Sequence, residues 1–331
     1  MRVLITGGAG FIGSHLAERW LKEGASVEII DDLSTGSLDN VAHLKHNPKF
    51  SCVLESIFDD QVVSELVDRC DMVYHLAAAV GVRLIVEKPT HTIETNVHGT
   101  EVILRAAAKK KKPLVMASTS EVYGKSVFAP FREDTDIVIG PTTKSRWSYA
   151  CSKALDEFLG LAYWQEKQVP VTIARLFNTV GPRQTGQYGM VIPTFVGQAL
   201  RGAPITVHGS GEQTRCFSYV GEVVECLVRI GTRGNLAGEV INIGSDQEVC
   251  MNQVAALVKG ITRSSSDIVR IPYDVAYSPG FEDMPRRVPC LEKVERLLGF
   301  RPHMSLDRII GMVAADLRQR NRESWQTAGI L

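Results

Sequence analysis

The chain lacks an apolar run of the roughly 20 residues that a membrane-spanning helix needs, and it carries no net charge. Its 37 Lys and Arg residues balance 37 Asp and Glu residues. A chain without a global positive field does not gather nucleic acid or anionic lipid. The sequence therefore predicts neither a nucleic-acid partner nor a membrane partner, and any basic site must be local.

Cysteine is present, but not in a pattern that holds a metal. The seven cysteines include no Cys-x-x-Cys pair, so we expect reduced and mostly buried thiols. His43 and His46 are too few to hold a metal by themselves, and the sequence predicts no metal site. The first residues form a short strand-like run and lack the charged, apolar and small-residue regions of a signal peptide. We therefore expect a cytoplasmic protein.

The length of 331 residues predicts two lobes at roughly 150 residues per domain. The first 120 residues alternate β-branched runs with helical patterns, which is typical of parallel strands joined by crossover helices. We predict an α/β fold: a Rossmann-type, doubly wound parallel sheet in residues 1–177, with a smaller substrate-binding lobe in 178–331. Later segments near 205–245 are expected to complete the sheet.

The individual elements follow from the same patterns. The predicted strands are 3–6, 26–30, 72–76, 114–117 and 171–176, with short strands near 205–208 and 239–243. The predicted helices are 11–23, 59–68, 95–109 and 149–165.

A glycine-rich turn follows the first predicted strand. Gly7, Gly10 and Gly13 let the backbone turn tightly and approach a pyrophosphate, whose charge then lies at the start of a helix. Asp31 ends the second predicted strand 18 residues after Gly13, where a carboxylate binds ribose hydroxyls and repels a 2′-phosphate. This context predicts NAD rather than NADP. The residues expected against it are Gly7, Gly10, Phe11, Ile12, Gly13, Asp31 and Asp32.

Tyr149 and Lys153 lie four residues apart in a predicted helix, on one face. A neighbouring cation stabilises phenolate, so we expect Lys153 to lower the pKa of Tyr149 and make it a base near neutral pH. Upstream, Ser118–Gly124 carries three hydroxyls and a carboxylate at a strand end, which is where open parallel sheets bind ligands.

These pieces together resemble the extended short-chain dehydrogenase/reductase family, the nucleotide-sugar epimerases, dehydratases and decarboxylases, from Arg2 to about Arg301. The matching segments are Gly7–Gly13, Leu76-Ala77-Ala78, Asn96, Ser118–Gly124, Tyr149/Lys153, Arg175–Asn178, Gly181-Pro182-Arg183 and Arg215. The resemblance implies an NAD-dependent enzyme in which Tyr149 deprotonates a sugar hydroxyl while carbon 4 gives up hydride. It also implies that Thr119 hydrogen-bonds that hydroxyl and that Lys153 holds the nicotinamide ribose.

The resemblance extends to further binding residues. It implies cofactor contacts from Leu76, Ala77, Ala78 and Asn96. Relatives often carry Asp-Leu or Asp-Ile after the third strand, where this chain has Ser56-Ile57, so the adenine contact stays open. For a nucleoside diphosphate, we expect Asn178, Arg183, Arg215 and Arg287 to bind the substrate, because cationic forks suit phosphates.

The fate of the 4-keto sugar depends on the residues after Ser118. Within the family, dehydratases usually carry Asp-Glu beside the catalytic Thr, and simple 4-epimerases carry small residues there. This chain has Ser120-Glu121 at that place. This block, with 140–149 and 280–289, looks most like UDP-glucuronate decarboxylases. That resemblance places Arg287 in the active site, and we expect Ser120, Glu121 and Arg287 to position the uronate carboxylate and handle the proton.

Several alternatives remain open from the sequence. The first is a UDP-glucose or UDP-glucuronate 4-epimerase, and a 4,6-dehydratase is another. A non-catalytic NAD sensor is a different class, although such proteins usually lose the Tyr or the Lys that this chain keeps. Relatives commonly form homodimers through two helices, here those near 95–109 and 149–165. The nucleotide base is also open, and UDP comes from the resemblance alone.

Overall fold

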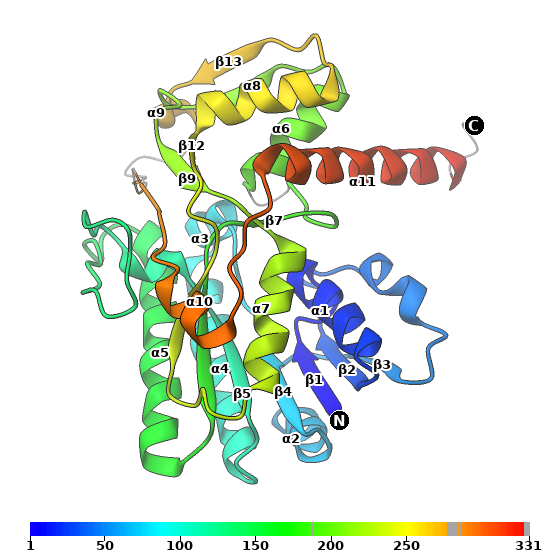
Figure 1. The fold of residues 1–331 in the computed structure, drawn as a ribbon, viewed down its shortest axis with the longest axis vertical. Helices are drawn as coiled ribbons and strands as arrows, with labels where there is room; N and C mark the ends of the chain where they lie inside the picture. Colours follow the sequence, from blue (N-terminus) through cyan, green and yellow to red (C-terminus); the bar gives the residue numbers. More distant parts are fainter. Residues whose placement is uncertain (187–188, 277–281, 283, 285, 328–331) are drawn as a thin grey trace.

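A computed structural model describes residues 1–186, 189–276, 282, 284 and 286–327 (Figure 1). Within them, a seven-stranded parallel sheet has the order β11-β6-β5-β4-β1-β2-β3. Its strands are β1 (Arg2–Thr6), β2 (Ser26–Asp31), β3 (Phe50–Leu54), β4 (Met72–His75), β5 (Leu114–Thr119), β6 (Val171–Leu176) and β11 (Val240–Ile243). This confirms the predicted Rossmann-type fold.

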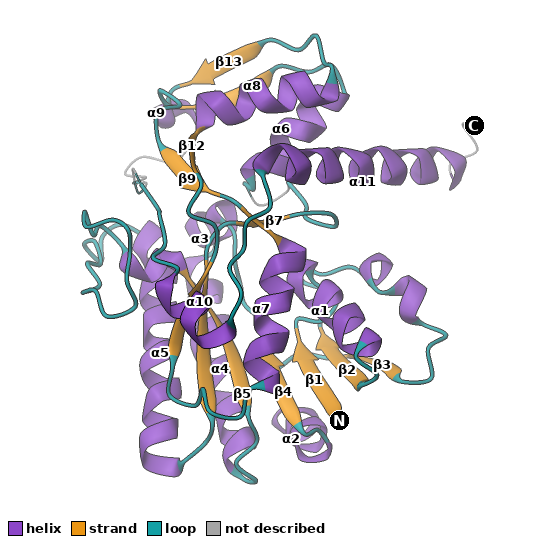
Figure 2. Ribbon diagram, viewed as in Figure 1, coloured by secondary structure: helices purple, strands orange, loops and turns teal. Residues whose placement is uncertain are grey.

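Helices cover both faces of this sheet (Figure 2). They are α1 (Phe11–Lys22), α2 (Asp60–Arg69), α3 (Val82–Glu87), α4 (Pro89–Ala108), α5 (Arg146–Lys167), α7 (Val220–Thr232) and α10 (Glu292–Leu298). Short 3₁₀ turns lie at η1 (Leu38–Asn40), η2 (Ala42–Leu44) and η3 (Ser120–Tyr123). No described helix is both long and apolar enough to cross a bilayer.

Two hydrophobic cores, one on each face of the sheet, explain why the strand sequences are continuous apolar runs. On one face, Trp20 of α1 and Leu227 of α7 pack against β1 and β11. On the other face, Leu66 of α2, Ile103 of α4 and Tyr163 of α5 pack against β4, β5 and β6. A parallel sheet covered on both faces buries both sets of side chains. Strand β3 departs from this pattern because it is an edge strand and largely exposed.

The second lobe lies beyond the carboxyl ends of the sheet strands (Figure 1). It contains β7 (Thr179–Val180), β8 (Ile205–His208), β9 (Thr214–Cys216), β10 (Ser218–Tyr219), β12 (Glu248–Cys250), β13 (Ile268–Ile271), α6 (Val191–Leu200), α8 (Met251–Thr262), α9 (Tyr273–Ala276) and α11 (Leu306–Thr327). The strands pair two by two, as β7 with β10, β8 with β13, and β9 with β12.

Of the segments near 205–245 that were expected to complete the main sheet, β11 lies in that sheet and β8 does not. Strand β11 pairs with β6 in the main sheet. Strand β8 instead pairs with β13, because its buried residues Ile205 and Val207 belong to the core that α6, α8 and α11 enclose. Helix α7 and strand β11 come after residue 177 in the sequence but pack in the first lobe. The predicted boundary near residue 177 therefore does not divide the residues of the two hydrophobic cores.

A buried ion pair fastens α5 to the sheet. Glu157 of α5 accepts from Arg175 of β6, with 2.7 Å between Oε2 and Nη2. Ser118 of β5 donates a hydrogen bond to Glu157, and Arg175 Nη1 donates to the hydroxyl of Tyr123 at 2.9 Å. Because Tyr149 and Lys153 lie on α5, this network positions them against the end of β5.

We expect Glu157→Gln to lower the free energy of unfolding by about 3–5 kcal/mol, because it leaves the buried Arg175 charge without its partner. The control is Arg69→Gln, which removes an exposed pair with Glu28 and is expected to cost less than about 1 kcal/mol. Urea unfolding followed by circular dichroism measures both. A loss in Glu157→Gln no larger than in the control would contradict this account of α5.

Candidate active site

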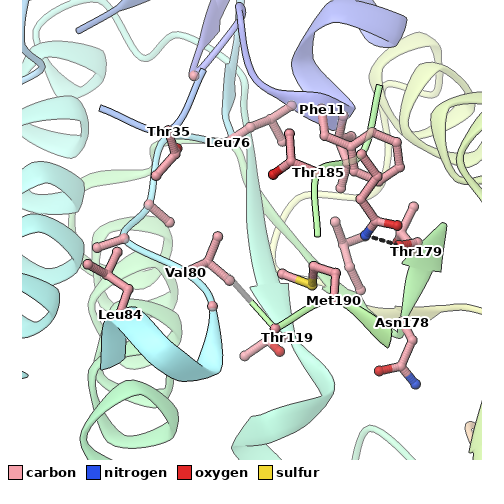
Figure 3. A pocket seen from close by; sticks show the side chains of 18 of the residues that line it. Phe11, Thr35, Leu76, Val80, Leu84, Thr119, Asn178, Thr179, Thr185 and Met190 are labelled. Atoms are coloured by element: carbon pink, nitrogen blue, oxygen red, sulfur yellow. Dashed lines mark hydrogen bonds between the residues drawn. The ribbon is translucent and has the colours of Figure 1, made fainter. Parts of the chain in front are cut away.

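A cavity of about 1240 Å³ opens at the carboxyl ends of the sheet strands, between the two lobes. Figure 3 shows Phe11 and Leu76 from the first lobe on one side, and Asn178, Thr179 and Met190 on the other. Open α/β sheets bind ligands at this edge, where neighbouring strands send their connections in opposite directions. The cavity is therefore the candidate active site.

Most of the residues predicted from the sequence as cofactor contacts line this cavity. They are Gly7, Phe11, Ile12, Gly13, Asp31, Asp32, Ser56, Ile57, Leu76, Ala77, Ala78, Tyr149 and Lys153. Gly10 instead forms the turn itself, as the residue that precedes α1. Asn96 lies behind the wall: its Oδ1 accepts from Ala79 N–H at 2.9 Å, and its Nδ2 donates to Ser152 Oγ at 3.1 Å.

The backbone packs too closely around the glycine turn to admit side chains. A Cβ on Gly13 would lie 2.2 Å from the Gly7 carbonyl oxygen, and one on Gly7 would lie 2.9 Å from Ala77 N. Gly7 also has a positive φ of +67°, which favours glycine. The first turn of α1 has no side-chain cap, so its N–H groups suit a pyrophosphate. These features fit a dinucleotide.

Asp31 is held in place at the end of β2. Its Oδ2 accepts from Ala9 N–H at 2.9 Å and its Oδ1 from Leu33 N–H at 2.8 Å. Burial raises the pKa of this carboxyl, and the two N–H donors oppose that effect. Asp32 turns toward its own loop, where its Oδ1 accepts from Ser34 N–H at 2.9 Å. Asp31 thus has the fixed position that ribose binding requires.

The predicted catalytic residues Thr119, Ser120, Glu121, Tyr149 and Lys153 meet at the far end of the same cavity. Strand β5 ends at Thr119, which caps the following turn by accepting from Glu121 N–H at 3.2 Å. The Thr119 hydroxyl also hydrogen-bonds the phenol of Tyr149. The sequence prediction that these side chains share one site agrees with this placement.

The expected direction of the Tyr149 pKa was wrong. Burial raises this pKa, and the carboxylates of Glu121 and Asp156 raise it further. The hydrogen bond from Thr119 and the charge of Arg146 oppose them. The net shift favours the protonated phenol.

Lys153 has a partner that the sequence reasoning missed. Its Nζ lies 2.7 Å from Asp156 Oδ2, and both side chains are buried. Burial raises the pKa of Asp156, and Lys153 and Thr100 oppose that effect. The spacing of three residues on one helix face was a usable signal for this pair.

Glu121 lies between two guanidinium groups. Arg146 Nη2 donates to its Oε1 at 2.7 Å, and Arg287 Nη1 donates to the same oxygen at 3.0 Å. Burial opposes the charged form, but the two arginines outweigh it and lower the pKa of Glu121 to about 2. Glu121 is therefore a carboxylate at neutral pH, and the expectation that it handles the proton stays a prediction.

The predicted substrate residues lie in different parts of the cavity wall. Asn178 Nδ2 donates to the Cys216 carbonyl at 3.0 Å, and Arg215 Nη1 donates to the Thr214 carbonyl at 2.7 Å. Both line the second-lobe side. Arg183 instead pairs with Glu18 of α1 and donates to Ser14 Oγ at 3.3 Å, so its guanidinium lies against the first lobe, beside the start of α1.

Helix α11 contributes wall residues that no sequence motif indicated. Asp316, Gln319 and Arg320 line the cavity, and Asp316 Oδ2 accepts from the backbone N–H of Arg183 at 3.0 Å. Of the 280–289 segment, residues 280, 281, 283 and 285 lie outside the described residues. Arg287 is described and faces the cavity.

A family model described as GDP-mannose 4,6 dehydratase matches residues 4–313. The chain belongs to this family of NAD-dependent epimerases and dehydratases. A UDP-N-acetyl-alpha-D-glucosaminuronate decarboxylase of Bacillus cytotoxicus is 46% identical over 308 residues, 93% of this chain and 94% of the relative. UDP-glucuronic acid decarboxylase 2 of Arabidopsis thaliana is 36% identical over 97% of this chain and 69% of the relative.

Solved structures agree with this placement. A UDP-glucuronic acid 4-epimerase of Bacillus cereus, in complex with UDP-glucuronic acid and NAD, matches with a TM-score of 0.87 and 29% identity, over 97% of this chain and 100% of that one. The predicted family, fold and NAD cofactor are thereby confirmed. The relatives of this chain are enzymes, which removes the alternative of a non-catalytic NAD sensor.

We expect Asp156→Asn to move the acid limb of the pH–activity profile to lower pH. Activity needs the Tyr149 phenolate, and the Asp156 carboxylate raises the Tyr149 pKa; removing that charge, and releasing the charge of Lys153, both lower it. The substitution also leaves Lys153 buried without its acid, which costs on the order of 3–5 kcal/mol of stability.

The control for this variant is Glu225→Gln, which removes a carboxylate that pairs with Arg19 and Arg229 on the surface. Its acid limb should coincide with that of the parent. An acid limb of Asp156→Asn that stays in place or moves to higher pH would show that Asp156 does not act on Tyr149.

Proposed function

We propose that this protein is an NAD-dependent decarboxylase of a UDP-linked hexuronic acid. The observation that carries the proposal is the position of Arg287, whose guanidinium reaches Glu121 on the cavity wall beside Tyr149. A planar guanidinium suits a carboxylate, and a sugar carboxylate is what distinguishes a uronate from a hexose. Decarboxylases of such substrates are among the relatives of this chain.

The first step is the oxidation of carbon 4. Tyr149, after losing its own proton, accepts the proton of the carbon 4 hydroxyl, and Thr119 orients that hydroxyl through the bond it makes with the phenol. Lys153 lies one helical turn away and holds the ribose of the cofactor. NAD⁺, held by the residues that line the first-lobe side of the cavity, would supply a reversible acceptor for the hydride of carbon 4. The sugar becomes a 4-ketone.

The second step is the loss of carbon dioxide. The carboxylate on carbon 5 is then β to the new carbonyl, which accepts the electron pair of the bond that breaks between carbons 5 and 6. Arg287 orients the carboxylate, and Ser120, which lines the wall next to Glu121, is in place to hydrogen-bond it. Carbon 5 then takes up one proton from solvent water, which replaces the lost carbon dioxide. Glu121 is not the source of this proton, because its pKa is about 2.

The last step restores the alcohol. Tyr149 gives its proton back to the carbon 4 oxygen, and the cofactor would return the hydride to carbon 4, so the product would be a UDP-pentose with no net consumption of NAD⁺. The Bacillus cytotoxicus relative is named for a 2-acetamido uronate and the plant relatives for glucuronate. UDP-glucuronate and its 2-acetamido counterpart are therefore the two substrates of this class to compare.

A 4-epimerase is the second candidate. The same Tyr149, Lys153 and Thr119 serve an epimerase, and the Bacillus cereus enzyme of similar fold is a UDP-glucuronic acid 4-epimerase. A 4,6-dehydratase fits less well, because it needs an acid to protonate the leaving hydroxyl. The carboxyl in this place, Glu121, is held ionised between Arg146 and Arg287.

We also propose a homodimer through α4 and α5, in the reducing environment of the cytoplasm. Ile93 of α4 and Leu155 and Phe158 of α5 are exposed apolar side chains on two helices that pack together. A second copy would cover them in a four-helix arrangement. The seven cysteines are all free, which agrees with a compartment that keeps thiols reduced.

The decarboxylase proposal predicts the mass of the product. Purified protein with NAD⁺ should convert UDP-glucuronate, its 2-acetamido counterpart, or both into a species lighter by one carbon dioxide, as read by mass spectrometry. Tyr149→Phe should slow this conversion by about 10²–10⁴-fold, the usual contribution of a general base. A product of unchanged mass with inverted carbon 4 would establish the epimerase instead.

The dimer proposal predicts a change of mass in solution. The parent chain of 36.4 kDa should have the mass of a dimer in light scattering. The double variant Leu155→Glu with Phe158→Glu should have the mass of a monomer, because dimerisation would bury two charges between the paired helices. The control is Leu257→Glu, on the exposed side of α8 in the second lobe. A parent that is monomeric at micromolar concentration would remove this proposal.

A further inference from the structure

A short loop of the second lobe is bonded to the first lobe beside the candidate active site. It follows β7, and its Pro182 carbonyl accepts from His15 Nε2 at 3.0 Å. Arg183 Nη1 donates to Ser14 Oγ at 3.3 Å, and Nη2 forms an ion pair with Glu18. The three partners on α1 lie close together, because residues three and four apart are neighbours on a helix. We call these three contacts the latch.

Asp316 of α11 holds the same loop from the second lobe. Its Oδ2 accepts from the Arg183 N–H at 3.0 Å and lies 3.1 Å from Arg320 Nε. Arg183 has a φ of +69°, which is uncommon for a residue with a side chain. Such a conformation persists where its surroundings fix it. Here Asp316 holds the backbone and α1 holds the guanidinium, so Arg183 connects α11 to α1.

Glu18 gives Arg183 a charged partner that lies outside the cavity wall. The side chains of Arg183 and Glu18 are 20% and 19% exposed, and salt screens a partly buried pair less than a surface pair. His43 Nε2 lies 2.7 Å from Glu18 Oε1, the atom that Arg183 contacts. Among the described residues, Arg183 lines the cavity, whereas Glu18 and His43 do not. A substitution at Glu18 therefore reaches the cavity through Arg183 and not by a contact with a ligand.

The latch adjoins the part of the cavity that fits a dinucleotide. Phe11 and Gly13, in the first turn of α1, line the cavity together with Arg183 and Thr185, and Figure 3 draws Phe11 and Thr185 on its wall. The latch contacts begin at Ser14, directly after Gly13. The loop thus borders the space that a cofactor on the first turn of α1 would fill.

We infer that Arg183 is a positioning residue for the cofactor: it fastens the loop after β7 to α1 and thereby keeps NAD bound. The sequence had suggested that Arg183 binds the substrate diphosphate instead. With the latch closed, NAD would leave only after these contacts break, so a weaker latch should release it faster. The inference depends on the cofactor and not on the reaction, since a decarboxylase and an epimerase that return the hydride both benefit from a cofactor that stays bound.

The test is the rate at which the protein loses NAD⁺. Protein loaded with radiolabelled NAD⁺ is mixed with excess unlabelled NAD⁺, and the label that stays bound is followed over time by rapid gel filtration. Glu18→Gln should speed the loss about 10-fold, because it replaces a charge-assisted contact of Arg183 by a neutral one. Arg183→Met should speed it at least as much.

Two further variants separate the latch from a general loosening of the fold. The double variant Glu18→Gln with Arg183→Met should match Arg183→Met alone, because both substitutions remove the same contact. Arg183→Lys keeps the positive charge and should lose NAD⁺ more slowly than Arg183→Met. The affinity for UDP, measured by calorimetry on NAD⁺-loaded protein, should stay within about threefold of the parent in all of these variants, or well under the tenfold that one strong contact is worth.

The matched controls are Arg69→Met and Glu28→Gln, which break an exposed arginine–glutamate pair of the first lobe. Neither residue is among the described residues that line the cavity. Both variants should therefore lose NAD⁺ at the rate of the parent. If Arg183→Met does not fold, Glu18→Gln and Arg183→Lys carry the test, since each keeps a polar side chain in its place.

Three results would overturn the inference. The first is a rate of NAD⁺ loss in Glu18→Gln equal to that of the parent, whether or not Arg183→Met is faster, because Arg183 would then act without the latch. The second is a double variant in which the two single effects multiply. The third is a UDP affinity that falls about 10-fold or more in Arg183→Met while NAD⁺ stays bound, which would return Arg183 to the substrate. The mass of the sugar product decides the proposed function separately.

Discussion

The docking of α5 on the sheet is the constraint on which the rest of the site depends. The Glu157–Arg175 pair fixes the middle of this helix against β6, and Ser118 joins it from β5. From that anchor, the two turns toward the helix start carry Lys153 and Tyr149, and the first residue carries Arg146. One ion pair therefore sets the distance between the proton-accepting phenol and the end of β5, where Thr119 and Glu121 lie.

A second constraint is charge, because the site is buried and nearly every ionisable group in it is paired. Asp156 neutralises Lys153, and Arg146 neutralises Glu121. Within these pairs, the carboxylates of Glu121 and Asp156 raise the pKa of Tyr149, and the charge of Arg146 lowers it. Burial and the carboxylates prevail, so the pKa of Tyr149 is raised.

The sequence predicted those parts of the site that depend on local spacing. The glycine turn, Asp31 and the Tyr149–Lys153 pair each form within one strand, turn or helix, so a single segment contains the whole signal. The Rossmann-type sheet followed from alternating runs for the same reason. Strand β8 shows the limit, because a short β-branched run reads alike in either sheet, and only its packing against the second-lobe core decides where it pairs.

The parts that the sequence did not predict depend on contacts between distant segments. Arg183 meets Glu18 across 165 residues. Resemblance placed Arg287 in the active site, but its hydrogen bond to Glu121 across 166 residues was not predicted. No sequence motif indicates that α11 forms a cavity wall. Arg146 stood in a segment already singled out, but its contact with Glu121 depends on packing between segments, which the sequence alone does not reveal.

The arrangement around Arg287 also bears on the rate of decarboxylation. A carboxylate that leaves as carbon dioxide loses its charge, so a guanidinium that binds it strongly stabilises the ground state more than the transition state and slows the step. Arg287 also donates to Glu121 at 3.0 Å. In the proposed reaction a substrate carboxylate would therefore share this guanidinium with Glu121, and sharing weakens the hold on the ground state that would slow the step.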